Sequence, residues 1–362
     1  MNDKIKNILQ KLEDNGFTAY VVGGFVRDYL LGIETYDVDI ATSAEPKDVR
    51  SIFDLSNAND DNYGSIYIKD KLYNYDITTY RKELKYVNRR PVEYTYLDTV
   101  DKDIERRDFT INSLYMDKSG TVFDKVGGKQ DLEDKIIRMI GNINDKMIED
   151  PLRMLRAVRF AATLDFVLES TLKNYIKQNT QMLRTLSYTR KKEELDKIFS
   201  SQNRLKGINL LKNLKMDKDL DLEIPDDVVD SINPLGIWAQ LKVSGDYSFT
   251  KEETDIIDKI KSIISYGIID NVVLYEYGLY PSIIASDILG LNRKYISDIY
   301  KNMPIYSVKD IKINGDEIIN ILGIEPGSII KDIILDIELN ILNGTLENDF
   351  SKIKEYILKN WR

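Results

Sequence analysis

The sequence contains neither cysteine nor histidine. Without cysteine, the chain can form no disulfide, no zinc–thiolate site and no cysteine nucleophile. Without histidine, it can form neither a Ser-His-Asp triad nor a metal site of the HExxH or His-Asp phosphohydrolase type. Any metal ion that the protein binds must therefore be held by oxygen ligands, which favours magnesium, manganese or calcium.

Long apolar runs are also missing. The N-terminal stretch MNDKIKNILQKLEDNGF carries charges throughout and lacks the apolar core of a signal peptide, and no later segment is apolar for long enough to span a membrane. We therefore expect a cytoplasmic protein with no membrane partner. Proline is scarce, with 8 residues, and repeats and low-complexity tracts are absent, so domains must be inferred from changes in residue pattern.

The 362 residues are 43% apolar and 31% charged, which is typical of globular domains with buried cores. The net charge of −9 does not by itself suggest a nucleic-acid-binding protein. The arginines are distributed unevenly, however, because 13 of the 16 lie before residue 191. Since the planar guanidinium binds phosphate through two parallel hydrogen bonds, chemistry on a polyanion is expected in the N-terminal half.

The residue pattern changes near residue 136. From Thr18 to Leu114, β-type runs alternate with shorter helical stretches, whereas after Ile136 apolar residues recur mainly at helical spacing. The sequence therefore predicts an α+β protein, in which a mixed α/β head is followed by mostly helical domains.

The motif YVVGGFVRDYLLG places Gly23 and Gly24 between a buried-strand run and a helical pattern. Two glycines at such a junction let backbone N–H groups approach a ligand, and the helix N-terminus favours an anion such as phosphate. Arg27, in the first turn of that helix, would then point at the anion. The alternative is that the glycine pair forms an ordinary turn.

The motif YDVDIAT contains Asp37 and Asp39 in a strand-like context. Because side chains alternate along a strand, both carboxylates should lie on one face, with Val38 and Ile40 on the other. A divalent cation would relieve the repulsion between the two carboxylates, and oxygen ligands suit magnesium. A polar strand end or loop is the alternative.

A third carboxylate, Asp76, lies in the β-rich run YDITTYR. In two-metal active sites, a carboxylate from a neighbouring strand often orients or deprotonates the attacking hydroxyl and shares a metal. We take Asp76 as this residue. Asp70 and Asp61 compete with it as ordinary surface acids.

The segment ERRDFTINSL, residues 105–114, sets two arginines and an aspartate beside an apolar run that looks like a strand. The functional interpretation is that Arg107 contacts a triphosphate, while Asp108 and Asn112 fix its position and the sugar. A solvated charge cluster is the alternative.

The segment IEDPLRMLRAVRF, residues 148–160, predicts a helix that begins at Asp150 and Pro151. Three arginines recur every third residue on one broad face, namely Arg153, Arg156 and Arg159. An arginine in the first turn opposes the helix dipole, so Arg153 is better explained by a ligand. Asp150 and Arg153 can together accept from and donate to the edge of a nucleobase.

This acceptor and donor pair predicts which bases fit. Cytosine and adenine each present an exocyclic amino group next to a ring-nitrogen acceptor, which Asp150 and Arg153 can satisfy. Uracil and guanine would place a carbonyl oxygen against the Asp150 carboxylate, and unpaired polar groups in a closed site are unfavourable. We therefore expect the site to select C and A.

The motifs GGFVRD, DVD, DITTYR, RRDFTIN and EDPLRMLRAVRF, in this order, resemble those of class II CCA-adding enzymes and bacterial poly(A) polymerases, which belong to the polymerase-β-like nucleotidyltransferases. The match covers about residues 15–200. The segment SYTRKKEELDKIF resembles a further family element only in part, with Thr189 where the family has glutamate.

The resemblance implies specific roles for the residues in these motifs. Asp37 and Asp39 would bind magnesium, and the nucleotide would be contacted by two groups of residues: Gly24, Arg27 and Arg107 at its phosphates or sugar, and Asp150, Arg153, Arg156 and Arg159 on the helix. The reaction would be attack of a tRNA 3′-hydroxyl on the α-phosphate of CTP or ATP, without a template and with two magnesium ions.

The resemblance also implies four parts: a nucleotidyltransferase head (1–138), a helical neck with the nucleotide-selecting helix (139–200), a helical body (201–270), and a helical tail (271–362) that binds tRNA. The segment YRKELKYVNRRPVEYTY resembles the flexible loop of full CCA-adding enzymes, with an ordinary exposed hairpin as the alternative. The oligomeric state is left open, a homodimer included.

Several rival functions share these motifs. The nearest rival is a bacterial poly(A) polymerase, which has the same head but basic extensions; the acidic C-terminal part of this chain argues against it. A CC-only or A-only adding enzyme is the next possibility. A catalytically inactive RNA-binding protein on the same fold would be free to lose Asp37, Asp39 and Arg153. A small-molecule nucleotidyltransferase would not need the EDPLR helix or a long helical C-terminal half.

Overall fold

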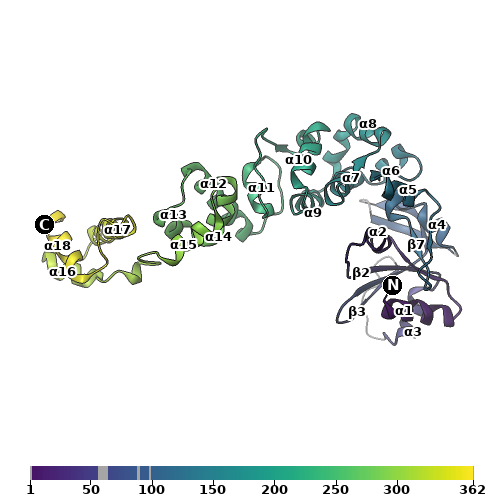
Figure 1. Ribbon diagram of the computed structural model, residues 1–362, viewed down its shortest axis with the longest axis horizontal. Coiled ribbons are helices and arrows are strands. Elements are labelled where there is room, and N and C mark those ends of the chain that lie inside the picture. Colours follow the sequence, from purple (N-terminus) through teal and green to yellow (C-terminus); the bar gives the residue numbers. More distant parts are fainter. Residues whose placement is uncertain (1, 56–63, 88–89, 98, 362) are drawn as a thin grey trace. The chain divides into compact units, whose positions relative to one another are not determined.

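The computed structural model describes residues 2–55, 64–87, 90–97 and 99–361, so Asp61 lies outside it. The chain divides into two compact units, Met1–Asp221 and Leu222–Arg362. Figure 1 shows the first unit as a sheet with its helices followed by more helices, and the second as helices almost throughout. The prediction of a mixed α/β head followed by helical domains is confirmed.

The head is built on a six-stranded mixed sheet in the order β3-β4-β2-β1-β7-β8. Only β2 and β4 pair in parallel; the other neighbours are antiparallel. The strands are β1 (Ala19–Val22), β2 (Asp37–Thr42), β3 (Ser65–Lys69), β4 (Asn74–Thr79), β7 (Tyr115–Met116) and β8 (Val122–Phe123), and the helices are α1 (Asp3–Asp14), α2 (Gly24–Leu31), α3 (Pro46–Phe53), α4 (Val100–Ile104) and α5 (Gly128–Glu133).

The segment that resembles the family's flexible loop forms a hairpin of its own, β5 (Arg81–Val87) and β6 (Arg90–Tyr96). Its strands pair with each other and belong to no other sheet. The two residues between them, 88 and 89, lie outside the described chain. The backbone here is a hairpin, and its role as the flexible loop of the family stays a prediction.

Residues 105–114 do not form the strand that the sequence predicted. The structure has a short 3-10 helix there, η1 (Thr110–Asn112). The Asp108 carboxylate accepts from the Phe109 amide at 2.8 Å, and the Ser113 hydroxyl donates to the Phe109 carbonyl at 3.0 Å. Such local bonds compete with a sheet ladder and favour a turn.

The helical part of the first unit packs around α7 (Leu152–Thr163), which lies against α9 (Tyr188–Phe199) and α10 (Arg204–Asn213). Helices α9 and α10 approach each other closely, because a β-carbon at Gly207 of α10 would stand 2.5 Å from Ile198 Cγ2 of α9. Its other elements are β9 (Ile136–Ile137), α6 (Ile143–Glu149), β10 (Val167–Leu168), α8 (Ser170–Gln178), η2 (Thr180–Thr185) and η3 (Asp217–Leu220).

The second unit is a set of short helices, several of which begin with capping boxes, as at Thr250 and Glu253. Trp238 is buried between Tyr247 and Phe249. The elements are β11 (Leu222–Glu223), α11 (Pro234–Gln240), β12 (Lys242–Val243), α12 (Lys251–Tyr266), α13 (Asn271–Tyr277), α14 (Leu279–Ile288), α15 (Arg293–Lys301), η4 (Val308–Asp310), α16 (Gly315–Leu322), α17 (Ile329–Leu342) and α18 (Phe350–Asn360).

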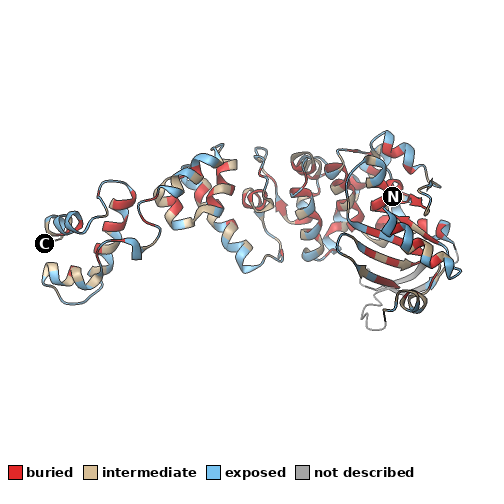
Figure 2. Cartoon of the chain, turned by 60° about the horizontal axis from the view of Figure 1, so that its bottom comes forward, coloured by how far each residue is buried: buried red, intermediate tan, exposed pale blue. Residues whose placement is uncertain are grey.

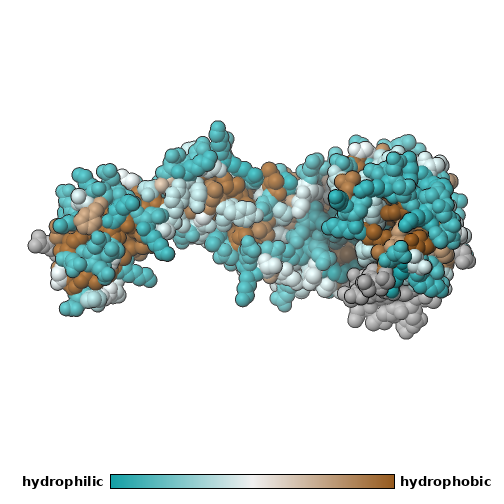
Figure 3. Space-filling model, turned by 90° about the horizontal axis from the view of Figure 1, so that it is seen from below, coloured by the Kyte–Doolittle hydropathy of each residue, from teal (hydrophilic) through white to brown (hydrophobic). Residues whose placement is uncertain are grey.

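Burial follows one face of many helices, as the red and blue stripes of Figure 2 show, whereas α7 is buried at most of its positions. Some apolar side chains of the second unit stay exposed, among them Leu335 and Leu339 of α17, and Figure 3 shows apolar surface over the C-terminal helices. Within the described residues, no helix is both long and apolar enough to cross a membrane. The cytoplasmic location and the boundaries at residues 138, 200 and 270 stay predictions.

Candidate active site

The turn between β1 and α2 lies against the acidic strand β2. Gly23 has a φ of 72°, and a β-carbon there would stand 3.0 Å from Asp39 Oδ2 and 3.2 Å from Arg107 Nη1. The positive φ favours glycine at this position, and a larger residue would also push the side chains of Asp39 and Arg107 away. Gly24 begins α2 and, like Gly23, lines a pocket.

The three predicted carboxylates lie on two adjacent parallel strands. Val38 and Ile40 are buried, so Asp37 and Asp39 project from the opposite face of β2, as predicted. Asp39 of β2 stands directly opposite Asp76 of β4. Asp37 stands opposite Asn74, whose side-chain amide donates to its Oδ1 at 2.8 Å.

The Asp39 carboxyl is in an unusual electrostatic environment. Although Asp39 still meets solvent on the pocket side, the surrounding atoms desolvate its carboxyl and raise its pKa to about 6. Arg107 opposes this increase, while the charges of Asp76 and Asp37 add to it. A carboxylate next to two others binds a cation readily, because the cation relieves the mutual repulsion.

The donors at this site suit magnesium, since all are carboxylate oxygens. No group of three or more acidic side chains in the described chain is arranged to hold a metal ion without further ligands. Magnesium, however, is commonly held by one or two carboxylates together with substrate phosphates. The chemistry of Asp37 and Asp39 therefore fits the ion, and their role as its ligands and the role of Asp76 stay predictions.

A cavity of about 460 Å³ begins at Asp39 and extends along α7. It is lined by Gly23, Gly24, Arg27, Asp39, Arg106, Arg107, Asp108, Asn112, Asp150, Arg153, Arg156, Arg159 and Phe160. A second cavity of about 620 Å³ shares Asp39, Arg106 and Arg107 with the first and contains Asp76. The predicted nucleotide residues thus line one cavity, and the predicted third carboxylate lines the adjoining one.

The arginines of the first cavity are held by acidic and amide partners. Arg27 donates to Asp28 at 2.8 Å and to Asn112 at 2.7 Å. Arg106 and Arg107 both pair with the buried Asp103, at 2.7 and 3.1 Å. Such fixed guanidinium groups offer a ready-made surface for phosphate.

Asp108 links the 3-10 turn η1 to the helix α7. It accepts from Asn112 at 3.2 Å and pairs with Arg156, whose Nη2 lies 2.6 Å from its Oδ2. Burial alone would raise the pKa of Asp108, but Arg156 and the hydrogen bonds outweigh it and hold this pKa below its ordinary value. Asp108 is therefore charged and ties α7 to the head.

Asp150 lies between two helices, α6 and α7. The helix α7 begins at Leu152, one or two residues later than predicted, because α6 ends at Glu149 and Asp150 is still extended. The N-cap is Pro151 instead of the predicted Asp150, although the Asp150 side chain accepts from the amide of Leu152, the first residue of the helix, at 3.2 Å.

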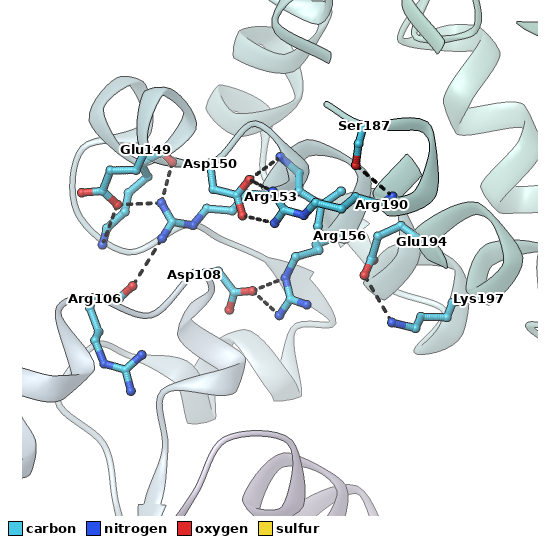
Figure 4. A network of polar contacts seen from close by, with 12 residues as sticks. Arg106, Asp108, Glu149, Asp150, Arg153, Arg156, Ser187, Arg190, Glu194 and Lys197 are labelled. Atoms are coloured by element: carbon cyan, nitrogen blue, oxygen red, sulfur yellow. Dashed lines mark hydrogen bonds and ion pairs between the residues drawn. The ribbon is translucent and has the colours of Figure 1, made fainter. Parts of the chain in front are cut away.

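Both proposed base-reading side chains have partners within the protein (Figure 4). Arg190 of α9 donates to both oxygens of Asp150. Arg153 donates to Glu149 at 2.8 Å and to the carbonyls of Lys146 and Arg106. Asp150 and Arg153 are therefore oriented, and they do not pair with each other.

Arg159 and Phe160 close the far end of the cavity. Arg159 Nε lies 2.7 Å from Glu194 Oε2, but the two buried atoms are not aligned for a hydrogen bond. The guanidinium groups of Arg27, Arg156 and Arg159 stand over the Phe160 ring at 5.2, 5.4 and 4.1 Å. The aromatic face thus holds three cations near one another.

Sequence reasoning missed several residues of this site. Arg190 and Glu194 were part of a segment that was noted only as a partial resemblance, Lys146 was noted only as a departure from the family's pattern, and Asp103 was not singled out. Their partners are distant in sequence or on other elements, so spacing alone does not reveal them. The signal available in the sequence was that each predicted arginine or carboxylate, once buried, needs a partner of opposite charge.

Known proteins resemble both ends of the chain. Residues 19–138 match the family described as poly A polymerase head domain, and residues 240–357 match tRNA nucleotidyltransferase domain 2, putative. A CCA-adding enzyme of Ligilactobacillus salivarius is 32% identical over 386 residues, covering 98% of this chain and 94% of that protein. The chain belongs to the CCA-adding enzyme family of nucleotidyltransferases.

Further relatives agree with this family. A CCA-adding enzyme of Streptococcus pyogenes is 30% identical over 97% of this chain and 95% of its own length. The crystal structure of Bacillus stearothermophilus CCA-adding enzyme in complex with CTP superimposes with a TM-score of 0.86, at 26% identity, over 99% of this chain and 96% of that one. The Thermotoga maritima enzyme complexed with tRNA, at 22% identity and a TM-score of 0.74 over 100% and 97% of the two chains, shares the fold. The predicted resemblance is confirmed.

Proposed function

We propose that this protein adds CCA to the 3′ end of tRNA from CTP and ATP, without a template, in the cytoplasm. The observation that carries this proposal is that Asp39 lines both cavities. One cavity contains Asp76, and the other contains the arginines together with Asp150 and Arg153. A phosphate that reacts at Asp39 could therefore be approached by the acceptor hydroxyl from the cavity with Asp76, while the rest of the nucleotide lies in the cavity with the arginines.

The nucleotide would lie along α7. Arg27 and Arg107 face the triphosphate from the head, and Asp108 and Asn112 fix the arginines and approach the sugar. Asp150 accepts from the exocyclic amino group of cytosine or adenine, while Arg153 donates to the adjacent ring nitrogen. Uracil and guanine would leave these groups unpaired or repelled, which accounts for the choice of C and A.

The acceptor hydroxyl would approach from the second cavity, on the side of Asp76. Its oxygen forms a bond to the α-phosphorus, and the bond to the leaving pyrophosphate breaks. Asp76 orients the hydroxyl and accepts its proton. Magnesium held by Asp37 and Asp39, when bound, lowers the pKa of the hydroxyl and neutralises charge on the phosphates.

The relatives lend support for the substrates. The Bacillus stearothermophilus structure contains CTP, and the Thermotoga maritima structure contains tRNA. Substrates and partners of the chain would accordingly be CTP, ATP and the tRNA 3′ end, with the helical C-terminal unit as the tRNA-binding part.

A direct test uses purified protein, magnesium and tRNA transcripts that end before CCA, after C and after CC. Each transcript is incubated with CTP, ATP, UTP or GTP separately, and the products are resolved by length. Addition of two C and one A, and then no further addition, is expected. Absence of any addition would mean that the protein is not an active nucleotidyltransferase.

Poly(A) polymerase is the second candidate, because the head matches a family described by that name. The same assay separates the two functions, since a poly(A) polymerase would extend the transcripts with long A tails. The match of residues 240–357 to a tRNA nucleotidyltransferase domain favours CCA addition.

A further inference from the structure

Lys146 is a buried lysine that does not line the nucleotide cavity but contacts residues next to it. It lies on α6, in the helix that precedes Asp150. Its ammonium donates to the backbone carbonyl of Glu105 at 2.6 Å and lies 3.9 Å from Glu149 Oε2. An ammonium is rarely buried unless it makes such bonds, because desolvation is unfavourable.

The carbonyl that Lys146 binds belongs to the peptide just before the phosphate-binding arginines. Glu105 is the C-terminal cap of α4, where helix carbonyls lack an intrahelical partner. Arg106 and Arg107 follow at once, and both pair with Asp103 of the same helix. Lys146 therefore fixes the start of the segment that carries Arg107 into both cavities.

Lys146 also contacts Arg153, one of the two proposed base-reading residues. The backbone carbonyl of Lys146 accepts from Arg153 Nη1, and Arg153 Nη2 donates to the carbonyl of Arg106 at 3.4 Å. Two neighbouring carbonyls of the head segment are thus held by Lys146 and Arg153. These contacts set the distance between the part of the cavity for the base and the part for the phosphates.

We propose that Lys146 is a positioning residue that holds residues 105–107 in place for the nucleotide triphosphate. The inference rests on the proposed function, because it assumes that CTP and ATP bind in the first cavity. The side chain of Lys146 binds Glu105 at 2.6 Å and lies farther, at 3.9 Å, from Glu149, whereas the backbone carbonyl of Lys146 accepts directly from Arg153. Loss of the ammonium should therefore weaken triphosphate binding and leave the choice of base intact.

The test compares Lys146→Met, which keeps the length of the side chain and removes the donor, with Lys146→Arg, which restores a donor. Lys177→Met serves as control, since Lys177 is exposed on α8. Isothermal titration calorimetry measures the Kd for CTP, ATP and UTP of the full chain with magnesium, without tRNA. Thermal melting establishes a temperature at which every variant is folded.

The Kd values of Lys146→Met for CTP and ATP are expected to rise by the same factor, about tenfold, with the preference for CTP over UTP unchanged. Lys146→Arg should recover most of the affinity, and Lys177→Met should match the unaltered protein. A merely structural role would lower the melting temperature and leave these Kd values unchanged.

Three results would overturn the inference: unchanged Kd values in Lys146→Met, a loss confined to one of the two nucleotides, or no recovery in a folded Lys146→Arg. If the unaltered protein binds neither CTP nor ATP, the proposed function fails instead. If it binds both and Lys146→Met binds them equally well, only the positioning role is wrong.

Discussion

Arg190 and Asp150 form a two-pronged ion pair, in which Nη1 lies 3.2 Å from Oδ1 and Nη2 lies 2.8 Å from Oδ2. The planar fork fixes the plane of the carboxylate as well as its position. Oδ1 also accepts from the Leu152 amide, whereas Oδ2 keeps a lone pair with which Asp150 can accept from a base. Through this pair, α9 sets the orientation of the proposed base-reading group.

We predict that Arg190→Ala relaxes the choice of base, because only the Leu152 amide then holds the Asp150 carboxylate and its plane is no longer fixed. The ratio of kcat/KM for CTP to that for UTP should fall about tenfold. Arg190→Lys should recover little, since an ammonium cannot bind both oxygens in one plane. Single-nucleotide incorporation measures the ratio.

Arg184→Ala is the matched control for this prediction. Arg184 also pairs with an aspartate, Asp219, in the same unit, but does not line the cavity. Its loss should leave the CTP to UTP ratio unchanged. An equal ratio in Arg190→Ala and the unaltered protein would show that the fork does not orient Asp150 for base selection.

The local motifs of the site could be predicted from sequence because each depends on neighbours in the chain. The alternation of strand side chains puts Asp37 and Asp39 on one face, and the glycine pair marks the start of α2. The pairing of Asp150 with Arg190 could not be predicted, because it arises from the packing of α7 against α9. The turn at Thr110–Asn112 was missed since its apolar residues mimic a strand, and side-chain hydrogen bonds decide the outcome.

We predict that Asp39→Asn lowers nucleotide transfer by about 100-fold or more, because it removes a negative ligand where cation and phosphate would meet. The change preserves shape, and it also ends the repulsion with Asp76 and Asp37, so the fold should be retained. Transfer of CMP to tRNA across a magnesium titration tests this.

Asp165→Asn provides the control for the same assay. Asp165 is an exposed residue with a φ of 58°, a conformation that asparagine tolerates. Transfer by this variant should equal that of the unaltered protein. If Asp39→Asn reached the full rate at high magnesium, Asp39 would contribute affinity for the ion but not to the reaction.

We predict that Asp108 stabilises the first unit in a pH-dependent manner. Its pKa in the folded protein lies below its ordinary value, and an unfolded aspartate titrates near pH 4. The stabilisation is therefore fully present above about pH 5 and is lost as the pH falls through the depressed pKa. Asp108→Asn should reduce the free energy of unfolding at pH 7 by about 3 kcal/mol, since it leaves Arg156 without its buried partner.

Scanning calorimetry at pH 7 and near pH 3 measures the difference between Asp108→Asn and the unaltered protein. This difference should shrink at the lower pH, because the Asp108 carboxyl of the unfolded chain is protonated there, so folding has to release a proton. Asp134→Asn, at an exposed position, should have little effect at either pH. A difference that is the same at both pH values would exclude the ion pair as its source.

The last prediction concerns Gly23 and separates backbone strain from loss of space. Gly23→Ala places a methyl group 3.0 Å from Asp39 Oδ2 and 3.2 Å from Arg107 Nη1, at a φ of 72°. Gly32, at the other end of α2, has a similar φ of 69° with no atom within 4 Å of a β-carbon. Gly32→Ala should therefore cost about 1 kcal/mol of stability and leave kcat unchanged.

Gly23→Ala should lower stability by at least as much and also reduce kcat by about tenfold or more, because the side chains of Asp39 and Arg107 must move away from the new methyl group. Thermal melting and steady-state transfer of CMP to tRNA, measured on both variants, separate the two effects. Equal kcat values in the two alanine variants would mean that the β1–α2 turn serves the fold alone, and the distance between Asp39 and Arg107 would then not limit the reaction.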